Sequence, residues 1–364
     1  MRYAVLGDVH GNYYALEAVI KNIIDKYDSE ITGFIFTGDY VGDFADGSKV
    51  VDLIQRISEE YKTYIIKGNR EIDQVGTYLE SLRHDKEPDW DLDSTMGAAL
   101  ISCRELGKER LKYLKSLPIS CIIRHDGKRP IFVKHKMPLD PNEIELVKRE
   151  NMVVITGHTH EAHKETKDGV SLYNPGSIGL PDDGIIAASY GIMESNDNGD
   201  WTFNICDLEY DYNKELESLK NNSDLYNRCC GWGKALELAL TTGVNCPSLY
   251  ANESRRLATL FSEAEEKGVR PEFDDVFKPY EIYRQNRSFN VNYDGSYLTD
   301  MGLQDFGNVE VFGPTEVVSV GTKPNNSAKP TKNIYLMALD NVKRQTMLAS
   351  REKVFLERHE PIVK

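Results

Sequence analysis

Seven polar residues along the chain have side chains that bind divalent cations. They are two carboxylates, one amide and four imidazoles: Asp8, His10, Asp39, Asn69, His135, His158 and His160. These groups are too many for an ordinary buried polar cluster, but they suit two divalent cations that share one bridging carboxylate. His158 and His160 belong to the segment GHTH and are separated by one residue, so a short turn lets them face two adjacent metals. The pattern therefore indicates a dinuclear metal site.

Each of these residues has a simpler explanation when it is taken alone. A single Gly-Asp pair, or one histidine after a strand, is more often a turn residue or a satisfied core group than a metal ligand. The order of all the pieces, and their common position at the ends of apolar runs, favours the metal site. The histidines His84, His125 and His359 follow no core strand, and we expect them to be solvated.

Apolar segments of strand length lead directly into the polar residues. Strand patterns at residues 3–7, 33–39 and 63–69 recur at intervals of about thirty residues, the length of a βαβ unit. The segments between them carry apolar residues at helical spacing, namely Leu16, Val19, Ile20, Ile23 and Ile24, then Val50, Ile54, Ile57 and Tyr61. The carboxyl ends of strands in an open α/β sheet border the crevice that binds ligands. We therefore expect the polar residues that end these three strands to converge: Asp8, Asp39 and Asn69.

The middle of the chain predicts further strands. A hairpin is expected over residues 120–135, where the dipeptide DG marks the turn. The segment GVSLYNPGSIGLP at 169–181 predicts a strand and a tight turn, and two more strands flank SNDNGD at 195–200. We expect a second sheet of antiparallel character by about residue 209, in a layered α/β or α+β core.

After about residue 211 the pattern changes to helices, in YNKELESLK, GWGKALELALTTG and ESRRLATLFSEAEEKG. We predict a core over residues 1–210, a helical extension over 211–285 and a C-terminal segment over 286–364. The stretch GTKPNNSAKPTK at 321–332 has the composition of a flexible linker.

Composition excludes several classes of protein. The 364 residues include 44 basic and 58 acidic side chains, and the net charge of −14 disfavours nucleic acid as a partner. The first residues enter a strand pattern without a basic and apolar leader, and no apolar run approaches the ~18 residues that span a bilayer. The six cysteines form no CxxC pair. We expect a cytoplasmic protein with reduced cysteines and no membrane partner.

The order of the motifs resembles that of the calcineurin-like metallophosphoesterase superfamily. The pattern D-x-H, GD, GN-H-D/E, H and GH-x-H is matched over about residues 1–209. The turn NPGS at 174–177 is similar to the corresponding stretch of the small prokaryotic phosphodiesterase branch. The loop GDYVGDFADG lacks the DRG of Ser/Thr protein phosphatases, which argues against that branch. The resemblance implies a four-layer α/β/β/α sandwich with a dinuclear centre.

The resemblance also implies a role for each ligand. One metal would take Asp8, His10, Asp39 and His160, and the other would take Asp39, Asn69, His135 and His158, so that Asp39 bridges. A hydroxide held between the metals would attack phosphorus in line, while both cations neutralise charge on the phosphoryl oxygens. The ligand set accepts Mn, Fe, Zn or Ni and does not select among them.

The residues after Asn69 depart from the family pattern. Arg70 and Glu71 stand where the family usually has a histidine that donates a proton or stabilises charge near the leaving group. Arginine does not release its proton, so Arg70 can hold a phosphoryl oxygen but cannot be the general acid. The proton must come from Glu71, from solvent or from a group such as His163, or else the leaving group needs little help. Catalytic candidates beside the metals are thus Asn69, Arg70 and Glu71. Lys136 also replaces the glycine that commonly follows the ligand histidine.

These observations predict a metal-dependent phosphoesterase that hydrolyses a small phosphodiester or phosphate ester. A binding scaffold of the same fold with an altered site is the alternative, which the Arg70 position would fit and the complete ligand set disfavours. A nuclease is a third reading, disfavoured by the acidic charge. The substrate and the oligomeric state stay open.

Overall fold

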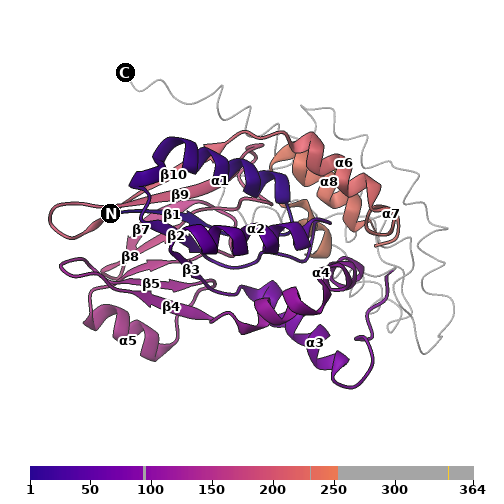
Figure 1. Ribbon diagram of the computed structural model, residues 1–364, viewed down its shortest axis with the longest axis horizontal. Helices are drawn as coiled ribbons and strands as arrows, with labels where there is room; N and C mark the ends of the chain where they lie inside the picture. Colours follow the sequence, from indigo (N-terminus) through magenta and orange to yellow (C-terminus); the bar gives the residue numbers. More distant parts are fainter. Residues whose placement is uncertain (93–95, 230, 253–342, 344–364) are drawn as a thin grey trace, which may run out of the picture. The chain divides into compact units, whose positions relative to one another are not determined.

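Ten strands form two five-stranded sheets in the part of the chain that the structure describes (Figure 1). The computed structural model describes residues 1–92, 96–229, 231–252 and 343. The chain divides into two compact units. The first comprises residues 1–229 and 239–245, and the second comprises residues 230–238 and 246–364. Both sheets lie in the first unit.

The first sheet has the order β10-β9-β1-β2-β3. Its strands are β1 (Arg2–Leu6), β2 (Gly33–Phe36), β3 (Thr63–Ile65), β9 (Ala188–Ser195) and β10 (Trp201–Leu208). β1, β2 and β3 run parallel, so their carboxyl ends meet at one edge, whereas β9 and β10 add to β1 as an antiparallel hairpin. Both faces of β9 are buried over its first six residues, as expected for a strand in the interior of a sheet.

The second sheet has the order β4-β5-β6-β8-β7. Its strands are β4 (Ser120–Ile123), β5 (Ile131–Lys134), β6 (Val153–Ile155), β7 (His163–Lys167) and β8 (Val170–Asn174). The expectation of an antiparallel second sheet that includes the strands around SNDNGD was wrong. Those strands are β9 and β10 of the first sheet, and the second sheet is mixed, with β5, β6 and β8 parallel. A strand pattern in the sequence predicts a strand but not which strand pairs with it, because pairing is determined by packing.

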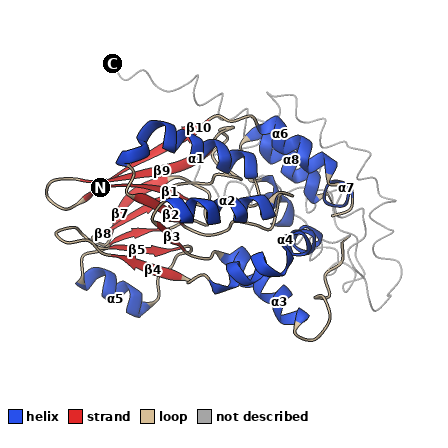
Figure 2. Ribbon diagram, viewed as in Figure 1, coloured by secondary structure: helices blue, strands red, loops and turns tan. Residues whose placement is uncertain are grey.

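Helices cover the outer faces of the two sheets (Figure 2). The helices of the first 210 residues are α1 (Tyr13–Tyr27), α2 (Gly47–Glu60), α3 (Gly76–Leu82), α4 (Gly97–Ser116) and α5 (Pro141–Arg149). Short 3-10 and π-helical turns lie at Asp28–Glu30 and Arg70–Val75. One core cluster joins α1, α2 and α4 to the first sheet, a second fills the space between the sheets, and a third joins α5 to the second sheet. The predicted α/β/β/α sandwich is therefore confirmed.

Helix α1 shows how the sequence specifies an element next to the site. Asn12 caps its first turn, with Oδ1 accepting a hydrogen bond from the Ala15 amide at 3.1 Å. The apolar face of α1 then packs on the first sheet through Leu16, Val19 and Ile23, which are fully buried. This packing fixes the loop that precedes Asn12, and that loop contains Asp8 and His10.

Residues after 211 form α6 (Tyr212–Asn221), α7 (Ser223–Asn227) and α8 (Trp232–Thr242). The predicted third helix near 253–268, the C-terminal segment over 286–364 except residue 343, and the linker at 321–332 lie outside the described residues. The proposed domain boundaries stay predictions. Among the described residues, no helix combines the length and the apolar character needed to cross a membrane.

Candidate metal centre

The loops that follow five strands meet at one end of the sandwich. Asp8 and His10 follow β1, Asp39 follows β2, Asn69 follows β3, His135 follows β5, and His158 and His160 follow β6. Backbone hydrogen bonds hold the loops together: the Val9 and His10 amides donate to the Asp39 carbonyl at 2.8 and 3.0 Å, and the Gly157 amide donates to the His135 carbonyl at 2.9 Å. The structure thus brings together all seven residues that the sequence singled out.

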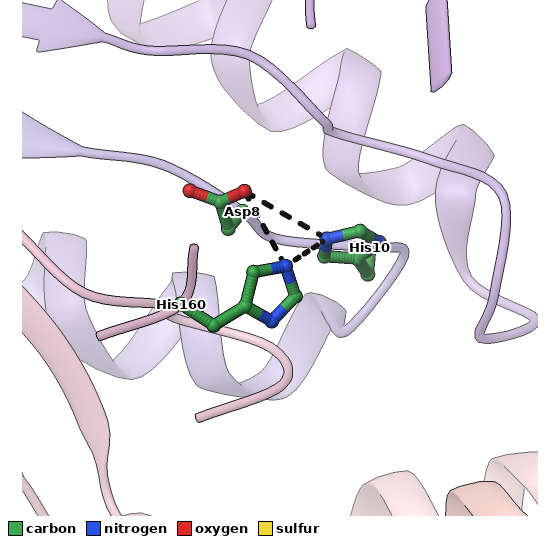
Figure 3. Close-up of side chains that lie close together, drawn as sticks. All are labelled: Asp8, His10 and His160. Atoms are coloured by element: carbon green, nitrogen blue, oxygen red, sulfur yellow. Dashed lines mark hydrogen bonds and ion pairs between the residues drawn. The ribbon is translucent and has the colours of Figure 1, made fainter. Parts of the chain in front are cut away.

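Asp8, His10 and His160 form the first group of side chains (Figure 3). The Nε2 atoms of His10 and His160 lie 3.0 Å apart, and Oδ1 of Asp8 is 3.9 Å from the former and 3.5 Å from the latter. All three residues are buried. Figure 3 shows their polar atoms turned toward one another.

Asp39, His135 and His158 form the second group, with Asn69 beside it. His135 Nε2 lies 3.3 Å from Asp39 Oδ2, and the Asn69 amide oxygen is 3.1 Å from that nitrogen and 2.8 Å from His158 Nδ1. The two histidines of GHTH therefore face different groups, His160 through Nε2 and His158 through Nδ1.

Asp39 faces both groups with the same atom. Its Oδ2 is 3.9 Å from His10 Nε2 in the first group and 3.3 Å from His135 Nε2 in the second. The other oxygen, Oδ1, accepts a hydrogen bond from the Arg70 amide at 2.7 Å. This position would suit a carboxylate shared by two cations.

Backbone strain is concentrated at these residues. Eight non-glycine residues in the described part of the chain have positive φ angles, and five of them belong to the two groups: Asp8, His10, Asp39, His158 and His160. A left-handed conformation costs a non-glycine residue about 1–3 kcal/mol and clusters at functional sites. The close approach also constrains Gly157, where a Cβ atom would lie 2.6 Å from Asp8 Oδ2.

Burial sets the protonation of the histidines in GHTH. It lowers the pKa of His158 to about 4 and, with the repulsion of His10, that of His160 to about 3. Both imidazoles are thus neutral near pH 7 and have a lone pair. Burial also raises the pKa of Asp8 to about 6.

Neighbouring charges shift the pKa values of His135 and Asp39 against the effect of burial. Burial alone would lower the pKa of His135, but the carboxylates of Asp39 and Asp8 raise it to about 9. Burial raises the pKa of Asp39, yet the charge and hydrogen bond of His135, with His10 and Arg70, bring it below its usual value. The two buried carboxylates therefore attract positive charge strongly.

Each ring that faces the first group is oriented by a partner on its other nitrogen. Asp43 Oδ2 lies 2.7 Å from His10 Nδ1, and the Leu180 carbonyl lies 2.5 Å from His160 Nδ1. In the second group, the Thr37 carbonyl is 2.8 Å from His135 Nδ1. Such contacts fix the tautomer of a metal-binding histidine. Sequence reasoning missed Asp43, although it is the second Gly-Asp pair of GDYVGDFADG and that repetition was a usable signal.

Arg70 lies beside the first group and is held by the same carboxylate. Its Nη2 is 2.9 Å from Asp43 Oδ2, and its side chain is 24% exposed. Its Nε is buried and has no hydrogen-bond partner among the described residues. Burial lowers the pKa of Arg70, but the neighbouring carboxylates, first Asp43, raise it, so the guanidinium stays charged.

Glu71 binds backbone rather than facing the two groups. Its Oε2 accepts the amides of Asp39 and Gly68 at 2.9 and 2.8 Å, and its Oε1 accepts the amide of Tyr40 at 2.9 Å. Burial and the charge of Asp39 raise its pKa to about 7. The contacts suit a residue that positions the loops after β2 and β3.

The remaining histidines occupy varied surroundings. His163 begins β7, and its Nδ1 contacts the Glu161 carbonyl at 3.0 Å. His84 is exposed, as expected, and His359 lies outside the described residues. His125 is half-buried, lies outside both groups, and has its Nε2 2.7 Å from the Tyr3 hydroxyl. The turn of the hairpin packs against β1, which the local sequence does not reveal.

The donor atoms fit divalent cations. If Nδ1 of His10 donates to Asp43 and Nδ1 of His160 donates to Leu180, a ring that carries a single hydrogen presents its lone pair at Nε2. Two lone pairs 3.0 Å apart, next to a buried carboxylate, repel each other unless a positive charge lies between them. Imidazole nitrogen with carboxylate oxygen is a ligand set of transition metals.

Comparisons with known proteins identify the family of the chain. A family model described as the calcineurin-like phosphoesterase superfamily domain matches residues 1–198. An uncharacterised protein of Methanocaldococcus jannaschii is 30% identical over 244 residues, 60% of this chain and 92% of that protein. The crystal structure of a hypothetical protein of Pyrococcus horikoshii has a TM-score of 0.51 at 20% identity, over 65% of this chain and 97% of that one. A metallophosphoesterase of Sphaerobacter thermophilus has a TM-score of 0.48 at 20% identity, over 67% of this chain and 99% of that one. The family match covers more than half of the chain, which therefore belongs to the calcineurin-like phosphoesterase superfamily.

Proposed function

We propose that the protein is a hydrolase of a small phosphodiester or phosphate ester that uses two divalent cations. One cation would be held by Asp8, His10, Asp39 and His160, and the other by Asp39, Asn69, His135 and His158. Asp39 would serve both, because its Oδ2 faces both groups. The identity of the metals, among Mn, Fe, Zn and Ni, is left open by this ligand set.

The observation that carries the proposal is the pair of facing nitrogens in the first group. His10 and His160 are each oriented through Nδ1, and their Nε2 atoms approach to 3.0 Å beside Asp8. The same three residues have strained backbones, with φ angles of 55°, 63° and 53°. A fold retains such strain where it positions functional groups.

Two divalent cations would neutralise charge on the phosphoryl oxygens and make water a nucleophile near neutral pH. Arg70 would bind a phosphoryl oxygen, since its guanidinium stays charged and its side chain is 24% exposed. Asp43 would hold both Arg70 and His10 in place, because its Oδ2 contacts both.

Departure of the leaving group is where this chain differs from the family pattern. Arg70 does not release a proton, and both oxygens of Glu71 accept backbone amides. We therefore favour a substrate whose leaving group departs with little protonation. Glu71 as the acid, with its pKa near 7, is the competing account.

The test is metal analysis together with a hydrolysis screen. The full chain is stripped of metal, loaded with Mn²⁺, Zn²⁺, Fe²⁺ or Ni²⁺, and assayed on aryl phosphodiesters, aryl phosphomonoesters and cyclic diesters, with Asp39→Asn as the control. Two ions per chain with hydrolysis that Asp39→Asn abolishes would support the proposal. Two ions without hydrolysis of any ester would favour the binding scaffold. A wild-type chain that binds no ion would refute the metal centre.

A further inference from the structure

A segment beyond the family match lies against the candidate metal centre. Residues 239–245 belong to the same compact unit as residues 1–229, although the family model ends at residue 198. The Gly184 amide donates to the Gly243 carbonyl at 2.8 Å, and the Asn245 amide donates to Asp182 Oδ1 at 2.9 Å. Both ends of residues 243–245 are thus attached to the loop at 182–184.

The approach of the two segments is close. Gly243 has a φ angle of +67°, and a Cβ atom there would lie 2.2 Å from the Ile185 carbonyl oxygen. Any larger residue would push residues 243–245 away from that loop. The glycine therefore permits a contact that places Asn245 at a defined position.

That position is beside a candidate ligand. The Asn245 side-chain amide lies 3.2 Å from His160 Nδ1, the same nitrogen that contacts the Leu180 carbonyl at 2.5 Å. His160 Nε2 faces Asp8 and His10, so Nδ1 carries the single hydrogen of the neutral ring. Rotation of the amide about its last bond gives Nδ1–H a second acceptor, the Asn245 oxygen.

We propose that Asn245 is a positioning residue of the metal centre. The residues that match the phosphoesterase family model would then not form the complete centre by themselves. The inference rests on the proposed function, because it concerns a ligand of the first metal. Asn245 and the Leu180 carbonyl together fix the rotation of the His160 ring and keep its Nε2 lone pair directed at the ion. An outer-sphere partner of this kind changes metal affinity by about 10–100-fold.

The test measures metal affinity rather than turnover. Mn²⁺ is titrated calorimetrically into the metal-free full chain, for the wild type, Asn245→Leu, Asn245→Ala and Asn245→Asp. We expect the two apolar variants to weaken one of two binding events by about 10-fold and to leave the other unchanged. Asn245→Asp retains an acceptor, so its affinity should stay close to that of the wild type. Asn221→Leu, at an exposed asparagine of α6, is the matched control.

Circular dichroism and urea unfolding show whether each variant is folded, and the contrast between alanine and aspartate remains informative if leucine does not fit. Unchanged affinity in both apolar variants would overturn the inference and leave the proposed function standing. An equal loss in Asn245→Asp, or in Asn221→Leu, would also overturn it. A wild-type chain without Mn²⁺ affinity would overturn the inference and the metal centre together.

Discussion

The carboxylate of Asp39 is the side chain whose replacement should cost the most activity. Its Oδ2 faces both groups, whereas His10 belongs to one. Asp39→Asn removes the charge that offsets two cations, so we expect loss of both ions and a fall in kcat/KM well beyond the ~100-fold typical of an outer-sphere partner. His10→Asn should weaken one ion and reduce kcat/KM less. Ion counts per chain and kcat/KM for an aryl diester measure both effects. Equal and mild losses would count against a shared ligand.

Arg70 should make the rate depend on the leaving group. Because arginine cannot donate a proton, esters of acidic phenols should react much faster than alkyl esters. Arg70→His supplies a possible acid but gives up bidentate contact with phosphate. The rate of hydrolysis should therefore rise for alkyl substrates and fall for aryl ones. Substrates graded by leaving-group pKa test this for the wild type and the variant. Similar rates for alkyl and aryl esters in the wild type would contradict it.

Metal affinity should rise with pH because His135 must lose its proton to bind a cation. Its pKa of about 9 means that the metal-free ring is protonated at pH 7. Apparent affinity should increase by up to about tenfold per pH unit between pH 6 and 9 and then level off. Below about pH 6 the dependence should steepen, since Asp8 also takes up a proton there. Mn²⁺ titrations between pH 5.5 and 8.5 check the slope, and a flat profile would show that His135 does not bind the ion.

The turns after β2 and β3 depend on Glu71 for their relative position. Its carboxylate accepts the amides of Gly68, Asp39 and Tyr40 in a buried site. Glu71→Ala leaves three buried donors without an acceptor, so we expect the free energy of unfolding to fall by about 3 kcal/mol or more. Urea unfolding measures it, with the exposed Glu80→Ala as the control, for which a change within about 0.5 kcal/mol is expected.

The kinetic behaviour of Glu71 separates positioning from acid catalysis. A positioning residue should affect alkyl and aryl esters equally when it is changed to glutamine. Selective loss on alkyl esters in Glu71→Gln, with normal stability, would instead establish the competing account in which Glu71 is the acid.

For the molecule as a whole, net charge restricts the substrate. A net charge of −14 repels a polyanion, so a duplex DNA should not bind even at about 50 mM salt, while a small aryl diester is hydrolysed. Fluorescence anisotropy of a labelled duplex measures this. Binding that weakens steeply as salt is added would contradict this prediction and favour the nuclease hypothesis.

The sequence by itself located most of the strands but not β7, together with the two helices after β1 and β2 and the seven side chains that meet at the strand ends. It did so because these features are local: an apolar run, a glycine and a polar residue follow one another in the chain. The resemblance added the sandwich and the pairing of ligands, of which the sandwich is confirmed and the pairing remains a proposal.

Only the tertiary structure decided how these pieces are joined. In the structure, β9 and β10 lie beside β1, the carboxylate of Glu71 accepts hydrogen bonds from backbone amides, and Asp43 contacts both His10 and Arg70. It also brought Asn245 to His160 across 85 residues. No local pattern encodes such contacts, because they form only when packing of the sheets and helices fixes the distances between loops that are remote in sequence.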